Sequence, residues 1–355
     1  MSDTAETKTA SSSPEPYIRD PLDEHTHTAI LLHDLGADSG LEFATRWFPA
    51  SMSGTRVEGL PLRLPGWRWV LPSALSSTTL SLSTLLPPLS PSKRELPLRN
   101  IAVVEDRDRD RDDLIEVPAW FETSSNSLTS ADATAKKDLG LLQQQMNGLR
   151  ESVEYVLGIL DKEIARLHGR AENVVLGGIG QGAAVALWTL LCLPPRSSLV
   201  TGASSGRIGG FVGHGCWLPF AEEVEGFFDL GEKGEEGSGS KVLEFVESRL
   251  ADTKTSLLQY DRGGGDAAAH PLLSTPVFLG HGVDDTHVDV RLGRKASDVL
   301  KNIGFRTVQL KVYAGAAEGG HWLKEPKEMD DIANFLEAVC REAGGEGGKG
   351  VTRMV

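Results

Sequence analysis

One segment near the middle of the chain has the spacing of a nucleophile elbow but lacks the nucleophile. Residues 173–184 read Asn-Val-Val-Leu-Gly-Gly-Ile-Gly-Gln-Gly-Ala-Ala, which predicts a buried strand, a tight glycine turn and a helix. An elbow has the pattern Gly-x-Ser-x-Gly on such a turn, where the serine hydroxyl attacks a carbonyl carbon. Both outer glycines, Gly178 and Gly182, are present, but Gly180 stands at the central position. The pattern therefore predicts an acyl-transfer site without its attacking hydroxyl.

The elements that must position this turn alternate between strands and helices. Short apolar runs predict the strands, and apolar residues at helical spacing predict the helices. This alternation is typical of an α/β domain, in which a mostly parallel central sheet has helices on both faces. We expect further strands at 28–33, 67–72, 208–213, 276–280 and 307–313, and helices at 138–167, 290–303 and 330–342.

The chain is long enough for one large α/β domain with insertions, and we expect that domain over residues 28–342. Residues 1–27 are polar and lack periodicity, which predicts a disordered tail. Residues 73–118 are rich in serine, proline and leucine, and predict an insertion or long loop. Residues 343–355 are rich in glycine and predict a flexible C-terminal tail.

Composition narrows the classes of partner and compartment. The formal net charge of −14 argues against unaided binding to nucleic acid or to an anionic bilayer. Cys192, Cys216 and Cys340 are widely spaced and odd in number, so they match no disulfide framework and favour a reducing compartment. No basic segment followed by an apolar one marks the N-terminus as a secretory signal. We therefore expect a cytoplasmic location.

Residues 174–193 are nearly uncharged and long enough to cross a bilayer. They also contain Gly178-x-x-x-Gly182, a spacing found where membrane helices dimerise. The glycines that cluster near the start of this run would break a helix there. A buried strand followed by a buried helix explains the same apolarity, so no transmembrane segment is predicted.

Several motifs, in order from about residue 28 to residue 340, resemble the acyl-protein thioesterase / phospholipase–carboxylesterase family of α/β-hydrolases. Each resembles one element of that family in type and in its place along the chain. The motifs are His33-Asp34-Leu35-Gly36, Pro118-Ala-Trp120-Phe121-Glu122, Gly177 to Gly182, Gly213 to Pro219, His281-Gly-x-Asp-Asp285 and Gly319-Gly-His321-Trp322.

The resemblance implies a catalytic acid and base, Asp285 and His321, in the chain order of this fold. His321 would take the proton of the nucleophile, and Asp285 would fix the tautomer of His321. The backbone N–H groups of Leu35 and Gln181 would form an oxyanion hole, in which each donor is worth roughly 3–4 kcal/mol in the transition state. The other side chains expected at the pocket are His33, Asp34, Trp120, Cys216 and Trp217.

Three departures from the family pattern fall on this site. Gly180 replaces the serine, Asp34 replaces a glycine beside an oxyanion donor, and Gly215 replaces a second serine. The family reaction is hydrolysis of carboxylic esters or acyl thioesters without a cofactor, on small acyl ligands, lipid-like ligands or proteins. The departures predict that this turnover is weak or absent. Glycine would also relieve the strained elbow backbone, which costs roughly 1–3 kcal/mol.

Two alternatives keep an active hydrolase: Cys216 acts as the nucleophile, or His321 activates a water molecule. A lone cysteine beside a tryptophan is more often a small buried residue. A metal site is disfavoured because no two of its possible ligands have a tight zinc spacing. Those possible ligands are His33, Asp34, His214, Asp285, His287 and His321.

An alternative from another class makes Gly180 functional. Residues 178–183 also fit Gly-x-Gly-x-x-Ala between a strand and a helix, the fingerprint of a dinucleotide-binding turn. That fingerprint expects an acidic residue for the ribose about twenty residues later. Residues 193–220 contain none, and this alternative gives His281 and His321 no role.

Overall fold

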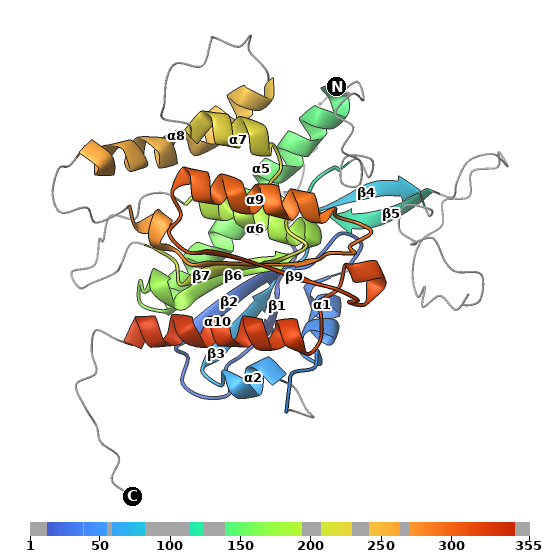
Figure 1. The fold of residues 1–355 in the computed structure, drawn as a ribbon, viewed down its shortest axis with the longest axis vertical. Coiled ribbons are helices and arrows are strands. Elements are labelled where there is room, and N and C mark those ends of the chain that lie inside the picture. The colour runs from blue at the N-terminus through green and yellow to red at the C-terminus, as the bar shows by residue number, and fades with distance from the viewer. Residues whose placement is uncertain are drawn as a thin grey trace, which may run out of the picture.

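The computed structural model describes residues 13–37, 39–54, 59–81, 114–123, 139–193, 207–228, 241–262 and 270–344. A central sheet in the order β1-β3-β2-β6-β7-β8-β9 crosses the molecule (Figure 1). Strand β1 pairs antiparallel with β3, whereas all the other neighbours are parallel. The strands are β1 (Tyr17–Arg19), β2 (His27–Leu32), β3 (Trp67–Leu71), β6 (Val174–Ile179), β7 (Gly210–His214), β8 (Val277–Gly282) and β9 (Val308–Tyr313).

Helices cover both faces of this sheet, and each face has its own apolar core (Figure 1). This arrangement confirms the predicted α/β-hydrolase class with its mostly parallel sheet. One face carries α5 (Leu139–Arg166), α6 (Gly180–Leu191) and α9 (Val290–Ile303), with α7 (Ala221–Phe228) and α8 (Lys241–Arg262) outside them. The other face carries α1 (Gly40–Trp47), α2 (Gly59–Arg63) and α10 (Lys327–Gly344).

The apolar run that is long enough to span a membrane divides at Gly180. Its first part is the fully buried strand β6, and its second part is α6, whose residues are all buried. A helix that is apolar all round is expected where it is enclosed by protein. In the described part of the chain, no helix is both long and apolar enough to cross a membrane.

The structure differs from the sequence-based expectation at the N-terminus and adds detail to the insertion. Strand β1 lies inside the predicted tail 1–27, where Tyr17 pairs with Leu71 of the sheet. A strand of three residues is too short to show a periodic pattern, so pairing with the partner strand determines it.

The predicted insertion 73–118 begins with β4 (Ser76–Ser81) and ends with β5 (Leu114–Ala119), which pair antiparallel. Residues 1–12, 82–113 and 345–355 lie outside the described residues.

Strand register brings the ends of distant segments to one edge of the sheet. Leu32 pairs with Gly178, and Ile179 pairs with His214. The chain leaves each of these parallel strands at the same edge, so the following turns meet there. The turn after β2 supplies Asp34, and Gly180 follows β6 directly.

Close packing of the elbow against β2 generates a stability prediction. A Cβ at Gly182 would overlap the carbonyl oxygen of His33 and lie 2.6 Å from the carbonyl carbon of Leu32. Backbone atoms cannot swing aside, so Gly182→Ala should lower the free energy of unfolding by about 1–3 kcal/mol. Gly158→Ala is the matched control, because Gly158 lies within α5 with nothing within 4 Å of its Cβ position. It should raise the free energy by about 0.5–1 kcal/mol in chemical denaturation; equal effects would contradict the packing argument.

Candidate functional site

The side chain of Asp34 occupies the space that a serine side chain would need at position 180. Gly180 has φ +52°, a left-handed conformation that glycine adopts with little strain. A Cβ on Gly180 would lie 2.8 Å from Asp34 Oδ2 and closer still to Oδ1. The missing nucleophile and the added carboxylate are therefore two parts of one local arrangement.

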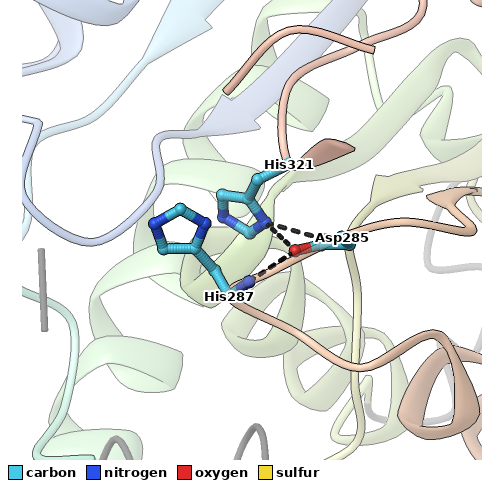
Figure 2. A group of neighbouring side chains, drawn as sticks. All are labelled: Asp285, His287 and His321. Carbon is cyan, nitrogen blue, oxygen red and sulfur yellow. Dashed lines mark hydrogen bonds and ion pairs between the residues drawn. The ribbon is translucent and has the colours of Figure 1, made fainter. Parts of the chain in front are cut away.

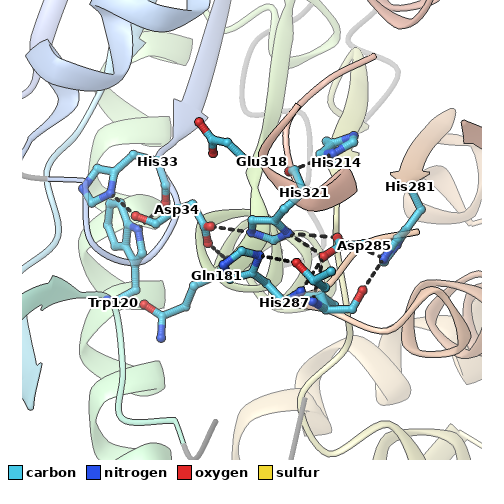
Figure 3. Close-up of polar contacts among 12 residues, drawn as sticks. His33, Asp34, Trp120, Gln181, His214, His281, Asp285, His287, Glu318 and His321 are labelled. Carbon is cyan, nitrogen blue, oxygen red and sulfur yellow. Dashed lines mark hydrogen bonds and ion pairs between the residues drawn. The ribbon is translucent and has the colours of Figure 1, made fainter. Parts of the chain in front are cut away.

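The Asp34 carboxylate joins the elbow to the histidine loop (Figure 3). Its Oδ1 accepts a hydrogen bond of 2.7 Å from the backbone N–H of Gln181, in the first turn of α6. Its Oδ2 lies 2.7 Å from His321 Nε2. N–H groups in a first helical turn have no partner within the helix and attract anions. Asp34 thus supplies, from the chain itself, an anion at the expected oxyanion site.

Asp285 holds the opposite side of the same imidazole (Figure 2). Its Oδ2 lies 2.8 Å from His321 Nδ1. Its Oδ1 accepts hydrogen bonds from the backbone N–H groups of His287 and Val288, at 2.8 and 2.9 Å. These two N–H groups fix the orientation of the carboxylate, which in turn fixes the plane of the imidazole.

Hydrogen bonding and electrostatics make His321 an imidazolium. Both of its ring nitrogens face carboxylate oxygens, so both must carry protons in order to donate. Burial disfavours the charged ring, but the negative charges of Asp34 and Asp285 outweigh it and raise the pKa of His321 to about 10. Burial likewise opposes ionisation of Asp34, yet His321 and the N–H groups of Gln181 and Leu35 hold the pKa of that carboxyl below its usual range.

Two buried residues hold the backbone around Asp34. His33 Nε2 accepts a hydrogen bond from the N–H of Ala74 at 3.0 Å, so its Nδ1 carries the proton and donates to the Asp34 carbonyl at 2.7 Å. The indole N–H of Trp120 donates to the His33 carbonyl at 2.8 Å, and its backbone N–H donates to Gln181 Oε1 at 2.8 Å. His33 and Trp120 therefore serve as supports for the loop, with their polar atoms engaged.

The comparisons with known proteins agree on one family. The sequence profile described as Phospholipase/Carboxylesterase matches residues 115–233. Acyl-protein thioesterase 1 of Debaryomyces hansenii is 21% identical over 226 residues, which cover 64% of this chain and 69% of that protein. Acyl-protein thioesterase 1 of Yarrowia lipolytica is 22% identical over 93% of this chain and 99% of that protein.

Solved structures agree on the fold. The crystal structure of Zea mays acyl-protein thioesterase 2 has a TM-score of 0.53 at 21% identity, covering 92% of this chain and 98% of that chain. The predicted resemblance to the phospholipase/carboxylesterase family is confirmed. The turn that carries Gly180 lies within the residues that the family profile matches.

His214 is a residue of this site that the sequence reasoning considered only as a metal ligand. Its Nε2 lies 3.1 Å from the carbonyl oxygen of His321, and its Nδ1 lies 2.6 Å from Glu328 Oε1. Glu328 Oε2 also accepts the backbone N–H of Lys324. Both side chains of the His214–Glu328 pair are buried. The pair fixes the loop that presents His321, although nothing in the sequence links the two positions.

The other residues predicted at the pocket are buried in the core. Cys216 is 1% exposed, and burial raises the pKa of its thiol far above the usual range. A buried thiol of this kind holds its proton and is a poor nucleophile. Trp217 is also buried and packs against Phe121, with ring centroids 6.3 Å apart. Neither observation supports Cys216 as a replacement for the missing serine.

The only described group of three residues whose ligand atoms approach closely enough for a metal is Asp285, His287 and His321, within 4.8 Å of one another. Both nitrogens of His321 already face carboxylates, and Asp285 Oδ1 accepts two backbone N–H groups. A metal would have to displace these hydrogen bonds. The arrangement therefore favours a proton-bearing site over a metal site.

The dinucleotide alternative meets an electrostatic obstacle at the same turn. Its pyrophosphate would need the N–H groups at the start of α6. The N–H of Gln181 instead donates to Asp34, so a pyrophosphate would meet a carboxylate. This geometry favours the hydrolase alternative.

The Asp34–His321 contact predicts how the histidine titrates. His321 should remain protonated at pH 8, and Asp34→Asn should lower its pKa because the largest opposing charge is removed. Because the folded pKa is raised, the stabilisation is full below the unfolded value of 6.5 and is lost as pH rises towards about 10. Nitrogen-15 NMR of the imidazole and unfolding free energies across this pH range measure both effects. A wild-type ring that titrates near pH 6.5 would contradict the ion pair.

Proposed function

We propose that this chain is a hydrolase-fold protein that has lost serine-dependent hydrolysis of esters and thioesters. One observation carries the proposal: the Asp34 carboxylate lies against Gly180 and bonds both His321 Nε2 and the N–H of Gln181. His321 is the proposed base, and the N–H of Gln181 is a proposed oxyanion donor. Asp285, Leu35 and Gly180 complete the proposed site as orienting acid, second oxyanion donor and degenerate nucleophile position.

Three steps of the family reaction are impaired together. No hydroxyl is present at position 180, and loss of a serine nucleophile costs roughly 2 × 10⁶ in kcat in a serine protease. The substrate carbonyl must compete with Asp34 for the oxyanion donors, each worth roughly 10²–10³ in kcat. The proposed base, His321, is already protonated at neutral pH because its pKa is raised to about 10.

The remaining role that we propose is recognition of an acyl ligand. The named relatives are acyl-protein thioesterases, so the ligand classes are a small acyl ester, an acyl thioester, a lipid-like molecule or a protein. No cofactor enters this proposal. We also propose a cytoplasmic location, which is consistent with the free thiols of Cys192, Cys216 and Cys340.

Restoration of the site tests the proposal. Gly180→Ser alone should react weakly at most with a fluorophosphonate, because Asp34 keeps His321 protonated and its carboxylate must swing aside to make room for the new side chain. Gly180→Ser combined with Asp34→Gly should gain labelling at position 180 and measurable hydrolysis of p-nitrophenyl octanoate, because the second change frees the oxyanion donors and lowers the pKa of His321. The unfolding free energies of the two single variants and the double variant should be non-additive by about 0.5–3 kcal/mol, as for residues in contact.

The controls separate chemistry from folding. The wild-type chain should remain unlabelled, and His321→Gln should abolish the activity of the double variant. Saturable wild-type ester hydrolysis faster than about 1 s⁻¹ that requires His321 would overturn the proposal. A folded double variant that stays inert would show that position 180 is not an elbow.

Ligand binding distinguishes the acyl site from the dinucleotide alternative. Fatty acids or non-hydrolysable acyl analogues should raise the melting temperature, whereas NAD should not. A ligand at 100 times its Kd stabilises a protein by about 2.7 kcal/mol, which a thermal-shift measurement detects. A shift with NAD and none with any acyl ligand would favour the nucleotide site.

A further inference from the structure

The oxyanion donors of this site face the chain's own carboxylate. In acyl transfer such donors point at the oxygen of the carbonyl that will be attacked. Here the N–H of Gln181 bonds Asp34 Oδ1, and His321 Nε2 faces Oδ2 of the same carboxylate. If Asp34 were converted into an ester, its own carbonyl would lie in the oxyanion site with a base beside it.

We infer that Asp34 is a nucleophile toward saturated carbon atoms that carry a leaving group, such as those of alkyl halides and epoxides. Carboxylates act as covalent nucleophiles when a neighbouring base can complete the second step. This inference rests on the site proposed above. It gives a substrate class to the alternative in which the chain is an active hydrolase with a nucleophile other than serine.

The geometry favours saturated carbon over an acyl carbon as the target. Attack on an acyl carbon creates an oxyanion on the substrate, which needs donors that Asp34 Oδ1 already occupies. Displacement at saturated carbon creates no oxyanion on the carbon that is attacked, because the bonding pair goes to the departing halide or to the opened epoxide oxygen, which takes a proton from water. The same donors then become useful in the second step, when the tetrahedral centre forms at Asp34 Cγ.

Of Asp34, His321 and Asp285, Asp34 has the side chain that is exposed enough to contact a ligand. Its side chain is 26% exposed, compared with 8% for His321 and 0% for Asp285. The three side chains lie in a row, as Figure 3 shows with Asp34 on one side of the His321 imidazole and Asp285 on the other. His33, through its hydrogen bond to the Asp34 carbonyl, fixes the backbone of the nucleophile.

The first step exchanges one bond for another. Asp34 Oδ2 forms a bond to the substrate carbon as the bond to the leaving group breaks. A halide departs with the electron pair, whereas an epoxide oxygen keeps the pair as an alkoxide that stays attached to the substrate and takes a proton from water. Asp34 becomes a neutral ester, so one of the two negative charges that keep His321 protonated disappears, its pKa falls and the Nε2 proton passes to solvent.

The second step returns the carboxylate. Neutral His321 takes a proton from water while the water oxygen bonds to Asp34 Cγ, and the N–H groups of Gln181 and Leu35 hold the oxyanion on Oδ1. Collapse of this centre breaks the ester bond, and the alkoxide receives the proton from His321. The remaining acid proton of Asp34 passes to His321 and restores the ion pair. For an alkyl halide the sum is one water consumed and one alcohol, one halide and one proton released; for an epoxide it is one water consumed and one diol released.

Isotope labelling tests this sequence on the wild-type chain. Excess protein is incubated with styrene oxide or benzyl bromide in oxygen-18 water, and its peptides are measured by mass spectrometry. Water attacks Asp34 Cγ, so the peptide that contains Asp34 should gain oxygen-18. In His321→Gln the second step lacks its base, and the alkyl group should remain on Asp34 at about one equivalent per chain.

Matched variants separate this chemistry from non-specific alkylation. Asp34→Asn should lose both the adduct and the isotope label. Asp298→Asn should retain both, because Asp298 is a carboxylate of α9 with 66% of its side chain exposed. With both probes, absence of oxygen-18 in the Asp34 peptide and of an Asp34 adduct in His321→Gln would overturn the inference, as would equal modification of Asp298. Fluorophosphonate labelling of the wild type would instead overturn the proposed loss of serine chemistry.

Discussion

The contact between the Asp34 carboxylate and the His321 imidazolium is the interaction on which the site depends. Two carboxylates enclose one buried ring, and only a doubly protonated ring satisfies both. A half-buried carboxylate that loses this partner would destabilise the fold. The ion pair therefore sets the protonation state of the histidine and places a carboxylate at the proposed oxyanion site. In this orientation the carboxylate also leaves no room for a side chain at position 180.

The surrounding elements keep this ion pair in place through hydrogen bonds between distant segments. Trp120 connects the end of β5 to the β2 loop and to Gln181. His214 and Glu328 connect β7 and α10 to the carbonyl of His321. Since these side chains are buried, the site rests on rigid parts of the fold, which favours fixed geometry over adaptation to a ligand.

The sequence predicted the fold well because its strands are apolar runs and its motifs follow a known order. The turn at Gly180 and the fold class could be recognised in this way. Three features could not. Overlap of Asp34 with the Cβ position of Gly180 depends on a side-chain orientation across segments far apart in sequence, and the pair of His214 and Glu328 joins positions separated by 114 residues. Strand β1 was also missed, because three residues carry no periodicity.

The mutual exclusion of side chains at positions 34 and 180 constrains the order in which such a site can arise. Starting from the glycine and serine of the family pattern at these positions, introducing Asp34 first would make its carboxylate turn away from the serine side chain and from His321. Replacing the serine first leaves open space, and Asp34 can then enter and pair with His321. The mutational path therefore has a favoured order. Return to the family's residues is easiest from position 34, since a serine introduced first at position 180 makes the carboxylate turn away and give up its contact with His321.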